Sequence, residues 1–271
     1  MNSITAKNFS LKHTLECGQF FRHEPLTCSY FIAAGDKIIK LRQEGSRLFY
    51  SSNSEKVNSK FIRKFFRLDE DYEKIIREIS KDVHVKKAVK RFRGLRLIRQ
   101  EPFECLISYM CSAASSIPRI KKNINELAKC AGKKAVFDGF EAYAFPEPKQ
   151  LCRKDVSKCG LGFRAGRIYE AMNSLSREYL EKIRNMKYPE AKKELMKISG
   201  VGEKIADCVL LFSMDFPEAF PVDTWVRKTM IKKYFRKKVS DKKIREKAKE
   251  KFGKYAGYAQ QFLFHSARNH D

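Results

Sequence analysis

The sequence has no long hydrophobic run. No stretch of 18 uninterrupted apolar residues occurs among its 271 residues, whereas a bilayer-spanning helix needs about 20 predominantly apolar ones. The first residues, MNSITAKNFSLKH, also lack the apolar segment of a secretory signal. We therefore expect no membrane association and a location inside the cell.

Cysteine motifs are missing as well. The eight cysteines include no CxxC pair, and no pair of histidines stands near them at zinc-site spacing. Four closely spaced C-terminal cysteines, which an iron–sulfur cluster would need, are excluded because Cys208 is the last cysteine. We expect free thiols in a reducing compartment, no cofactor and no catalytic metal.

Acidic residues are few relative to basic ones. Asp and Glu number 32 against 57 Lys and Arg, which gives a formal charge of +25, and the basic excess is spread along the chain. Solubility needs only a modest net charge, so this excess predicts a polyanionic partner, above all nucleic acid. A featureless basic surface and a membrane surface remain as alternatives.

Hydrophobic patterning divides the chain into two regions. Residues 9–52 contain short alternating runs, YFIAAGD, KIIKLRQ and RLFYSS, separated by Gly, Asp and Ser, which indicate an antiparallel sheet. After Asn53 the apolar spacing becomes helical. We predict an α+β protein, with a small antiparallel β-sheet domain over residues 1–82 and a mainly α-helical region over residues 83–271.

Shorter signals subdivide the helical region. FPEPKQL, residues 145–151, is typical of a turn that enters a helix, and GLGFRAGR, residues 160–167, of a glycine-rich connection. The basic run over residues 227–254 still carries apolar residues at intervals, which indicates a helical surface rather than a disordered tail.

The most informative segment is LMKISGVGEKIADCVLLF, residues 195–212. Its apolar spacing predicts one helix that stops at Ser199 and Gly200 and a second that begins after Gly202. Glycines at such a turn permit positive φ and close backbone approach, and the second helix presents unpaired N–H groups. This hairpin is suited to bind one DNA phosphate without reading sequence.

Lys204 falls in the first turn of the second helix, where the positive helix end favours the neutral amine over the cation. A neutral amine can attack a sugar C1′ and form a Schiff base, but a lysine here can also simply contact phosphate, and spacing leaves the two roles evenly matched. In AFPVDTWVRK, Asp223 is placed to cap a helix. A carboxylate near Lys204 would also stabilise positive charge on the sugar.

The hairpin, with Gly200, Gly202 and Lys204, and the later residues 221–223 resemble the helix-hairpin-helix DNA glycosylase superfamily. GQFFRHEP, LRLIRQEPFECLISYMCS, GLGFRAGR and YAGYAQQFLF are similar to segments of 8-oxoguanine DNA glycosylase/AP lyases, in the same order. The resemblance covers nearly the whole chain. It implies a base excision repair enzyme that flips 8-oxoguanine out of duplex DNA, excises it and cuts the strand by β-elimination.

The resemblance also implies roles in catalysis and base recognition. Lys204 matches the Schiff-base nucleophile and Asp223 the catalytic aspartate. The carbonyl of Gly18 matches the acceptor of the N7 hydrogen that 8-oxoguanine has and guanine lacks.

Three further residues match the walls of the base pocket. Cys208 and Phe264 match the pair that sandwiches the flipped base, and Gln260 matches the residue that reads its Watson–Crick edge. Spacing is consistent with this, because Lys204 and Cys208, and likewise Gln260 and Phe264, stand four residues apart and share a helix face. From the residues alone, the more common roles are core positions for Cys208 and Phe264 and a solvated side chain for Gln260.

The residues matched to DNA contacts depart from the family pattern. Ala114 stands where long-form members have an asparagine that contacts the orphaned cytosine, and Trp225 where they have a phosphate-binding histidine. Phe163 replaces an intercalating tyrosine beside Arg164, while Arg119 keeps a cytosine-reading arginine. We hypothesise that Ala114 weakens the preference for cytosine opposite the lesion.

Two rival functions remain. A glycosylase for alkylated purines could use the same scaffold, although such monofunctional enzymes lack a lysine at the position of Lys204. A non-enzymatic DNA-binding module could use the hairpin for phosphate contacts alone. We expect a monomer that binds 8-oxoguanine-containing duplex DNA, in the cytoplasm with the nucleoid of a prokaryote or in a eukaryotic nucleus, and that needs no metal, whether or not the hairpin holds a monovalent cation.

Overall fold

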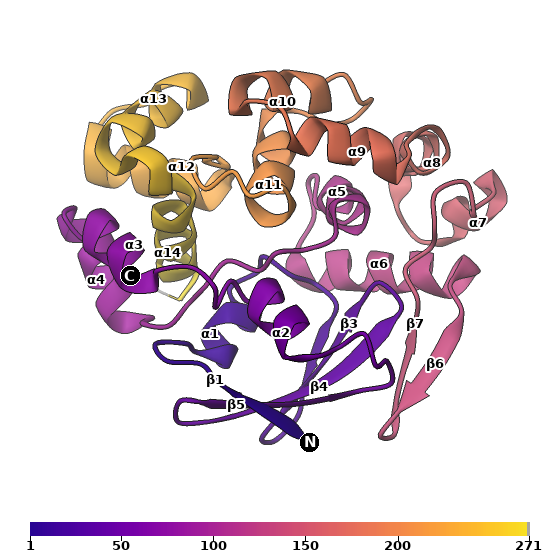
Figure 1. Cartoon of the computed structure of the whole chain (residues 1–271). Helices are drawn as coiled ribbons and strands as arrows, with labels where there is room; N and C mark the ends of the chain where they lie inside the picture. The colour runs from indigo at the N-terminus through magenta and orange to yellow at the C-terminus, as the bar shows by residue number, and fades with distance from the viewer. Residues whose placement is uncertain (270–271) are drawn as a thin grey trace.

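An antiparallel sheet lies at one end of the protein, and helices make up most of the rest (Figure 1). The computed structural model describes residues 1–269. The strands are β1 (Asn2–Thr5), β2 (His23–Pro25), β3 (Tyr30–Ala34), β4 (Lys37–Glu44), β5 (Arg47–Ser52), β6 (Lys134–Phe137) and β7 (Phe140–Tyr143). The helices are α1 (Leu11–Glu16), α2 (Ser59–Phe65), α3 (Tyr72–Ile79), α4 (Val83–Arg91), α5 (Pro102–Cys111), α6 (Ile117–Ala131), α7 (Arg153–Lys158), η1 (Gly162–Arg164), α8 (Ala165–Ser174), α9 (Arg177–Arg184), α10 (Tyr188–Leu195), α11 (Glu203–Ser213), α12 (Thr224–Met230), η2 (Ile231–Phe235), α13 (Asp241–Phe252), η3 (Gly253–Tyr255) and α14 (Ala256–Arg268). The predicted α+β class is confirmed.

The N-terminal sheet has five strands in the order β1-β5-β4-β3-β2, and each neighbouring pair is antiparallel. Tight turns at Gly35 and Gly45, with φ of +61° and +54°, join β3 to β4 and β4 to β5. These glycines are the breaks that separate the alternating runs in the sequence, because a two-residue hairpin turn requires positive φ. The prediction of an antiparallel sheet is confirmed.

Two features near the N-terminus differ from the prediction. The sheet starts before residue 9, because β1 pairs with β5. The segment that follows β1 is partly helical: Ser10 Oγ accepts a hydrogen bond from the His13 N–H at 3.2 Å and caps α1. Leu11 and Leu15 stand four residues apart and are both buried, so α1 places one apolar face on the core.

A second, two-stranded sheet interrupts the region over residues 83–271, which we predicted to be mainly α-helical without locating any strand in it. β6 and β7 form a hairpin whose turn is Asp138–Gly139, with φ of +50° and +76°. An Asp-Gly pair between alternating apolar residues is a strong hairpin signal, and residues 134–143 carry that pattern. The hairpin packs on the first sheet, where Phe140 stacks on Phe31 with ring centroids 4.6 Å apart.

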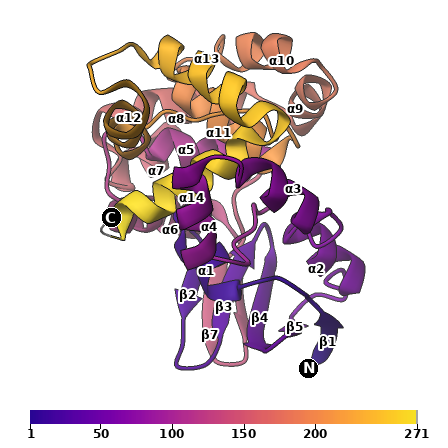
Figure 2. The same cartoon turned by 90° about the vertical axis from the view of Figure 1, so that its left-hand side faces the viewer.

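Buried residues form two clusters. One lies between the five-stranded sheet, α1 and α2, and includes Ile32, Leu41, Leu48 and Phe66. The larger cluster fills the helical region and extends from α3 to α14. Figure 2 shows α14 running beside α4 above the sheet. The division of the chain between residues 82 and 83 stays a prediction.

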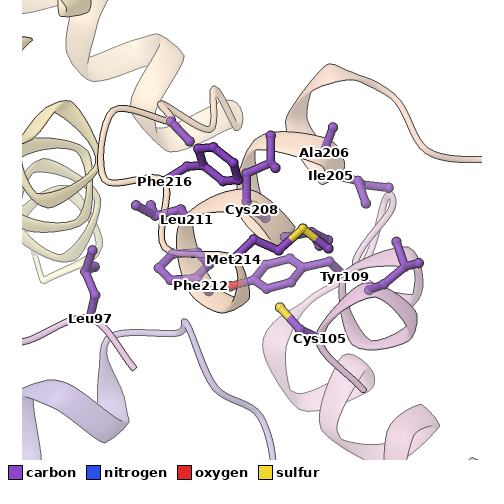
Figure 3. Packing of buried hydrophobic residues seen from close by; sticks show 14 of the residues in the cluster. Leu97, Cys105, Tyr109, Ile205, Ala206, Cys208, Leu211, Phe212, Met214 and Phe216 are labelled. Atoms are coloured by element: carbon purple, nitrogen blue, oxygen red, sulfur yellow. The ribbon is translucent and has the colours of Figure 1, made fainter. Parts of the chain in front are cut away.

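The centre of the larger cluster is the packing of α5 against α11 (Figure 3). Tyr109 of α5 stacks on Phe212 of α11, with ring centroids 5.6 Å apart and an angle of 10° between the rings. Cys105 of α5 and Cys208 of α11 lie in the same cluster. This packing fixes the first turn of α11, which carries Lys204, near the end of α5.

Three predictions for shorter segments can be compared with the structure. The stretch 145–151 contains a turn, and α7 begins soon after it, as predicted. The stretch 160–167 is a connection only in part, because η1 and the start of α8 fall within it. The basic run 227–254 is largely helical, as predicted. Within residues 1–269, no helix is long and apolar enough to cross a bilayer.

Candidate active site

A cavity of about 720 Å³ opens between α5, α11, α12, α14 and the segment that follows α1. Most of the residues singled out in the sequence line it: Gly18, Ala114, Gly202, Lys204, Cys208, Asp223, Trp225, Gln260 and Phe264. They come from segments far apart in the chain and are brought together by the packing of the helices. The cavity is therefore the candidate active site.

The predicted hairpin forms one edge of this cavity. Its first helix, α10, ends at Leu195, earlier than predicted, and turn hydrogen bonds such as Val201 N–H to Ile198 O cover the residues that follow. Gly200 has a φ of +86°, which favours glycine. Gly202 is exposed at the start of α11, so the first N–H groups of that helix lie next to solvent.

A buried carboxylate holds the two helices of the hairpin together. Asp207 of α11 is fully buried and accepts hydrogen bonds from the Tyr188 hydroxyl at 2.7 Å and from Lys192 Nζ at 2.9 Å. Burial raises the pKa of Asp207, and the positive charge of Lys192 opposes that rise. These contacts fix the position of α11, and with it Lys204, relative to α10.

Lys204 extends from the first turn of α11 into the cavity. Its Nζ donates a hydrogen bond to Ser112 Oγ at 2.8 Å and lies 5.2 Å from the centroid of the Tyr109 ring. Ser112 Oγ donates in turn to the Tyr109 carbonyl at 2.6 Å, so its lone pairs are free to accept from the lysine. The lysine amine is therefore held in one orientation on the cavity wall.

Asp223 lies at the start of α12 and lines the same cavity. Its Oδ1 accepts a hydrogen bond from the Val226 N–H at 2.7 Å, so the helix-capping prediction is confirmed. Burial raises the pKa of the Asp223 carboxyl, while the hydrogen bond from Val226 and the positive charge of Lys204 oppose that rise. A half-buried carboxylate thus faces a cavity that also holds an amine.

Gly18 contributes backbone to the cavity. Its φ is +82°, and an added Cβ would lie 2.8 Å from Arg268 Nη1 and 3.3 Å from Phe264 Cε1, so a side chain does not fit. The neighbouring carbonyls have protein donors: Gln261 Nε2 bonds to the Cys17 carbonyl at 3.0 Å, and the Tyr109 hydroxyl bonds to the Gln19 carbonyl at 3.0 Å. Within residues 1–269, no donor satisfies the Gly18 carbonyl.

The remaining pocket residues lie on two helices. Cys208 stands one turn after Lys204 on α11, and burial raises the pKa of its thiol to about 12, so it is a neutral, polarisable surface. Gln260 and Phe264 lie on α14. Gln260 is 4% exposed, yet its Oε1 has no hydrogen-bond partner in the part of the chain that the structure describes, which is unusual for a buried amide.

The other DNA-contact candidates lie outside the cavity lining. Arg119 is exposed in the first turn of α6, Gly200 is exposed on the hairpin, and the Phe163 side chain is 71% exposed. Arg164 does not fit the prediction of a direct DNA contact, because it is 5% exposed.

The guanidinium of Arg164 donates hydrogen bonds to backbone carbonyls of the protein itself. It donates to the carbonyls of Cys111 at 2.5 Å and Ala113 at 3.1 Å. Carbonyls at the end of a helix lack partners within that helix, and Arg164 satisfies those that follow α5. Its position supports the segment that carries Ala114.

Among the cavity residues that sequence reasoning missed are Tyr109, Ser112 and Arg268. The signal for Arg268 was present, since it stands four residues after Phe264 on the same helix. Ser112 and Tyr109 gave no local signal, because their contacts with Lys204 cross a long sequence distance. Within residues 1–269, no group of three or more His, Cys, Asp or Glu side chains is arranged to hold a metal ion.

Comparison with known proteins gives a consistent result. Residues 2–106 match the family described as 8-oxoguanine DNA glycosylase, N-terminal domain. The chain is 31% identical over 284 residues to the N-glycosylase/DNA lyase OGG1 of Arabidopsis thaliana, covering 96% of this chain and 78% of that protein. It is 34% identical over 200 residues to a probable N-glycosylase/DNA lyase of Methanothermobacter thermautotrophicus, covering 65% of this chain and 64% of that protein. The alignment with this second relative thus spans less than two thirds of its length.

The fold is also similar to solved structures. The 8-oxoguanine glycosylase/lyase of Clostridium acetobutylicum, solved with double-stranded DNA containing cytosine opposite 8-oxoguanine, superposes with a TM-score of 0.91. The two sequences are 37% identical, and the superposition covers 99% of this chain and 98% of that one. The sheet and the helical region are therefore both shared with that protein.

Proposed function

This chain belongs to the 8-oxoguanine DNA glycosylase/lyase family, and from that premise we propose that Lys204 acts as its Schiff-base nucleophile, with Asp223 as the stabilising carboxylate. The activity is that of the family: excision of 8-oxoguanine from duplex DNA, followed by cleavage of the strand. The observation that carries the proposal is the shared cavity, in which an oriented amine and a half-buried carboxylate face the same space.

DNA binding depends on the positive net charge of the protein and on exposed backbone at the hairpin. The formal charge of +25 favours duplex DNA through counterion release. The exposed N–H groups at Gly202 are placed to hold one phosphate, and the exposed ring of Phe163 can stack on a base next to the vacated position. The lesion nucleotide leaves the helix and enters the cavity.

Recognition of the damaged base uses two polar groups that have no hydrogen-bond partner among residues 1–269. The free carbonyl of Gly18 accepts the N7 hydrogen of 8-oxoguanine, and it would meet a lone pair at N7 of guanine. The unpartnered Oε1 of Gln260 lies buried at the wall where the Watson–Crick edge would lie. Cys208 and Phe264 supply apolar surface for the two faces of the ring.

The chemistry then follows from the amine and the carboxylate. The Lys204 amine attacks C1′ of the deoxyribose, the glycosidic bond breaks, and the base leaves with the bonding electrons. Asp223 stabilises the positive charge that develops on the sugar. Loss of a proton from the amine and ring opening give the Schiff base, and loss of the C2′ proton then expels the 3′ phosphate.

Borohydride trapping tests this proposal directly. We expect the protein to form a covalent adduct with an 8-oxoguanine:C duplex when borohydride reduces the Schiff base, and no adduct with the undamaged duplex of the same sequence. A failure to trap any duplex would favour the rival non-enzymatic binding module. Trapping or excision on alkylated purines alone would favour the rival glycosylase.

A second prediction concerns the base opposite the lesion. Ala114 is exposed at the cavity mouth and offers only a methyl group, so it cannot hydrogen-bond to an orphaned cytosine. We expect excision rates opposite C, A, G and T to lie within about tenfold of one another, since one base-specific contact is absent.

The matched variant for this prediction is Ala114→Asn. The φ of Ala114 is +48°, a backbone conformation that asparagine adopts more readily than alanine, so the substitution should not strain the loop. We expect Ala114→Asn to raise the rate opposite cytosine relative to the other three bases. Strict cytosine dependence of the wild-type protein, measured in single-turnover assays, would contradict the hypothesis.

The remaining proposals concern organisation and location. We propose that residues 1–82 and 83–271 are two domains, that the protein acts as a monomer, and that it lies with the nucleoid in a prokaryote or in the nucleus of a eukaryote. The presence of two buried clusters supports two units, although the larger cluster also contains Cys17, Phe21 and the buried face of α3, which precede residue 83.

A further inference from the structure

Arg268 lies in the base pocket but has no part in the mechanism above. It is the last residue of α14, four residues after Phe264 and eight after Gln260. This spacing places the three side chains on one face of the helix, and all three line the cavity. The face of α14 that carries the proposed base-reading residues therefore also carries a cation.

The guanidinium of Arg268 lies between Gly18 and Phe264. Its Nη1 is 2.8 Å from the place where a Cβ on Gly18 would lie. Its Cζ is 5.3 Å from the centroid of the Phe264 ring, which is within the range of a cation–π contact. Arg268 thus lies beside Gly18 on the cavity wall, and the Gly18 carbonyl has no donor among residues 1–269.

Arg268 Nη1 is buried and has no hydrogen-bond partner among residues 1–269. Burial lowers the pKa of Arg268, and the negative charge of Asp223 opposes this effect, but a guanidinium stays protonated in proteins. A buried charged donor without an acceptor is rare, since most such groups are paired. Its place on a cavity wall indicates that the missing acceptor belongs to a ligand.

We propose that Arg268 is a specificity-determining residue that donates a hydrogen bond to a carbonyl oxygen, O6 or O8, of the flipped 8-oxoguanine. This inference rests on the proposed function. In 8-oxoguanine these two oxygens flank the N7–H group. When the Gly18 carbonyl accepts the N7 hydrogen, a donor beside Gly18 faces one of the flanking carbonyls.

The same contact would assist departure of the base. The leaving base takes the electrons of the glycosidic bond, and the resulting negative charge spreads over the ring onto its carbonyl oxygens. A guanidinium at one of those oxygens binds the departing base more strongly than the intact nucleotide, which lowers the barrier to excision. Arg268 would then contribute to rate as well as to recognition.

Paired assays of Arg268→Gln test the proposal. We expect single-turnover excision of 8-oxoguanine to slow by about 10- to 100-fold, the usual effect of losing a charge-assisted hydrogen bond. Borohydride trapping on a preformed abasic site should stay within about twofold of wild type, because that substrate carries no base to contact. Lys90→Gln, which removes one exposed charge on α4, is the control and should leave both assays unchanged.

Other outcomes overturn the proposal in distinct ways. Excision at the wild-type rate by Arg268→Gln would show that the base makes no contact with Arg268. Equal losses in both assays would assign Arg268 to folding or to general DNA binding. If Arg268→Gln does not fold, the same two assays are run on Arg268→Lys. This variant keeps the positive charge but loses the planar guanidinium group. A wild-type protein that cannot be trapped on the abasic site would instead contradict the proposed function.

Discussion

Lys204→Gln abolishes the borohydride-trapped adduct and slows strand cleavage by at least about 10³-fold, while the variant still binds duplex DNA. Glutamine has no nucleophilic amine, so it cannot form a Schiff base. It does retain a hydrogen-bond donor for Ser112 Oγ, which Lys204 Nζ contacts at 2.8 Å, so the cavity wall should persist. The measurement is trapping on an 8-oxoguanine:C duplex, alongside a binding titration.

Lys197→Gln is the matched control for this variant. Lys197 belongs to the same hairpin segment, but its side chain is 62% exposed and pairs with Glu194 away from the cavity. Its loss removes one positive charge from the same hairpin segment and leaves the amine in the cavity unchanged. We expect trapping close to wild type. If both variants lose the adduct equally, Lys204 contributes only phosphate binding.

The parts of the site that local sequence predicted are those set by helix ends. The hairpin turn, the place of Lys204 in the first turn of α11 and the cap at Asp223 all depend on residues within a few positions of one another. Helix-end chemistry is local, because unpaired N–H groups and glycine conformations belong to the segment itself. These features were therefore accessible without a structure.

The rest of the cavity depends on contacts between distant segments. Spacing showed only that Gln260 and Phe264 share a helix face; their position near Gly18 came from the family resemblance. Ser112 and Lys204 are 92 positions apart, so no local pattern could pair them. Arg164 was matched to a DNA contact only through the family resemblance, and tertiary packing places its guanidinium on the carbonyls of Cys111 and Ala113 instead.

Asp223→Asn slows excision by about 10²- to 10³-fold and leaves thermal stability close to wild type. Asparagine keeps an oxygen that can accept the Val226 N–H, now bonded to Asp223 at 2.7 Å, and it is as good a helix cap as aspartate. It carries no negative charge, so the positive sugar loses its electrostatic partner. Single-turnover excision and thermal melting measure the two effects separately.

Asp223→Ala is the comparison that separates charge from capping. Alanine removes both, so we expect the same loss of excision together with a stability loss of about 0.5–2 kcal/mol. If Asp223→Asn excises at the wild-type rate and only Asp223→Ala is slow, Asp223 acts as a helix cap alone.

The pH dependence of excision follows from the burial of Asp223. Burial raises the pKa of this carboxyl, so as pH falls it takes up a proton at a higher pH than an exposed aspartate does. Protonation removes the charge that stabilises the sugar cation, and the wild-type excision rate should fall through this range. That step should be absent from the pH profile of Asp223→Asn, and its persistence would show that another group controls it.

The raised pKa also explains why this carboxylate suits the reaction. In the resting cavity, burial disfavours the charged form, and the Val226 N–H and the positive charge of Lys204 compensate only in part. A cation that develops on the sugar supplies the missing partner, so the carboxylate is better stabilised in the transition state than in the ground state. A fully solvated aspartate would gain less, because water already stabilises its charge before the reaction begins.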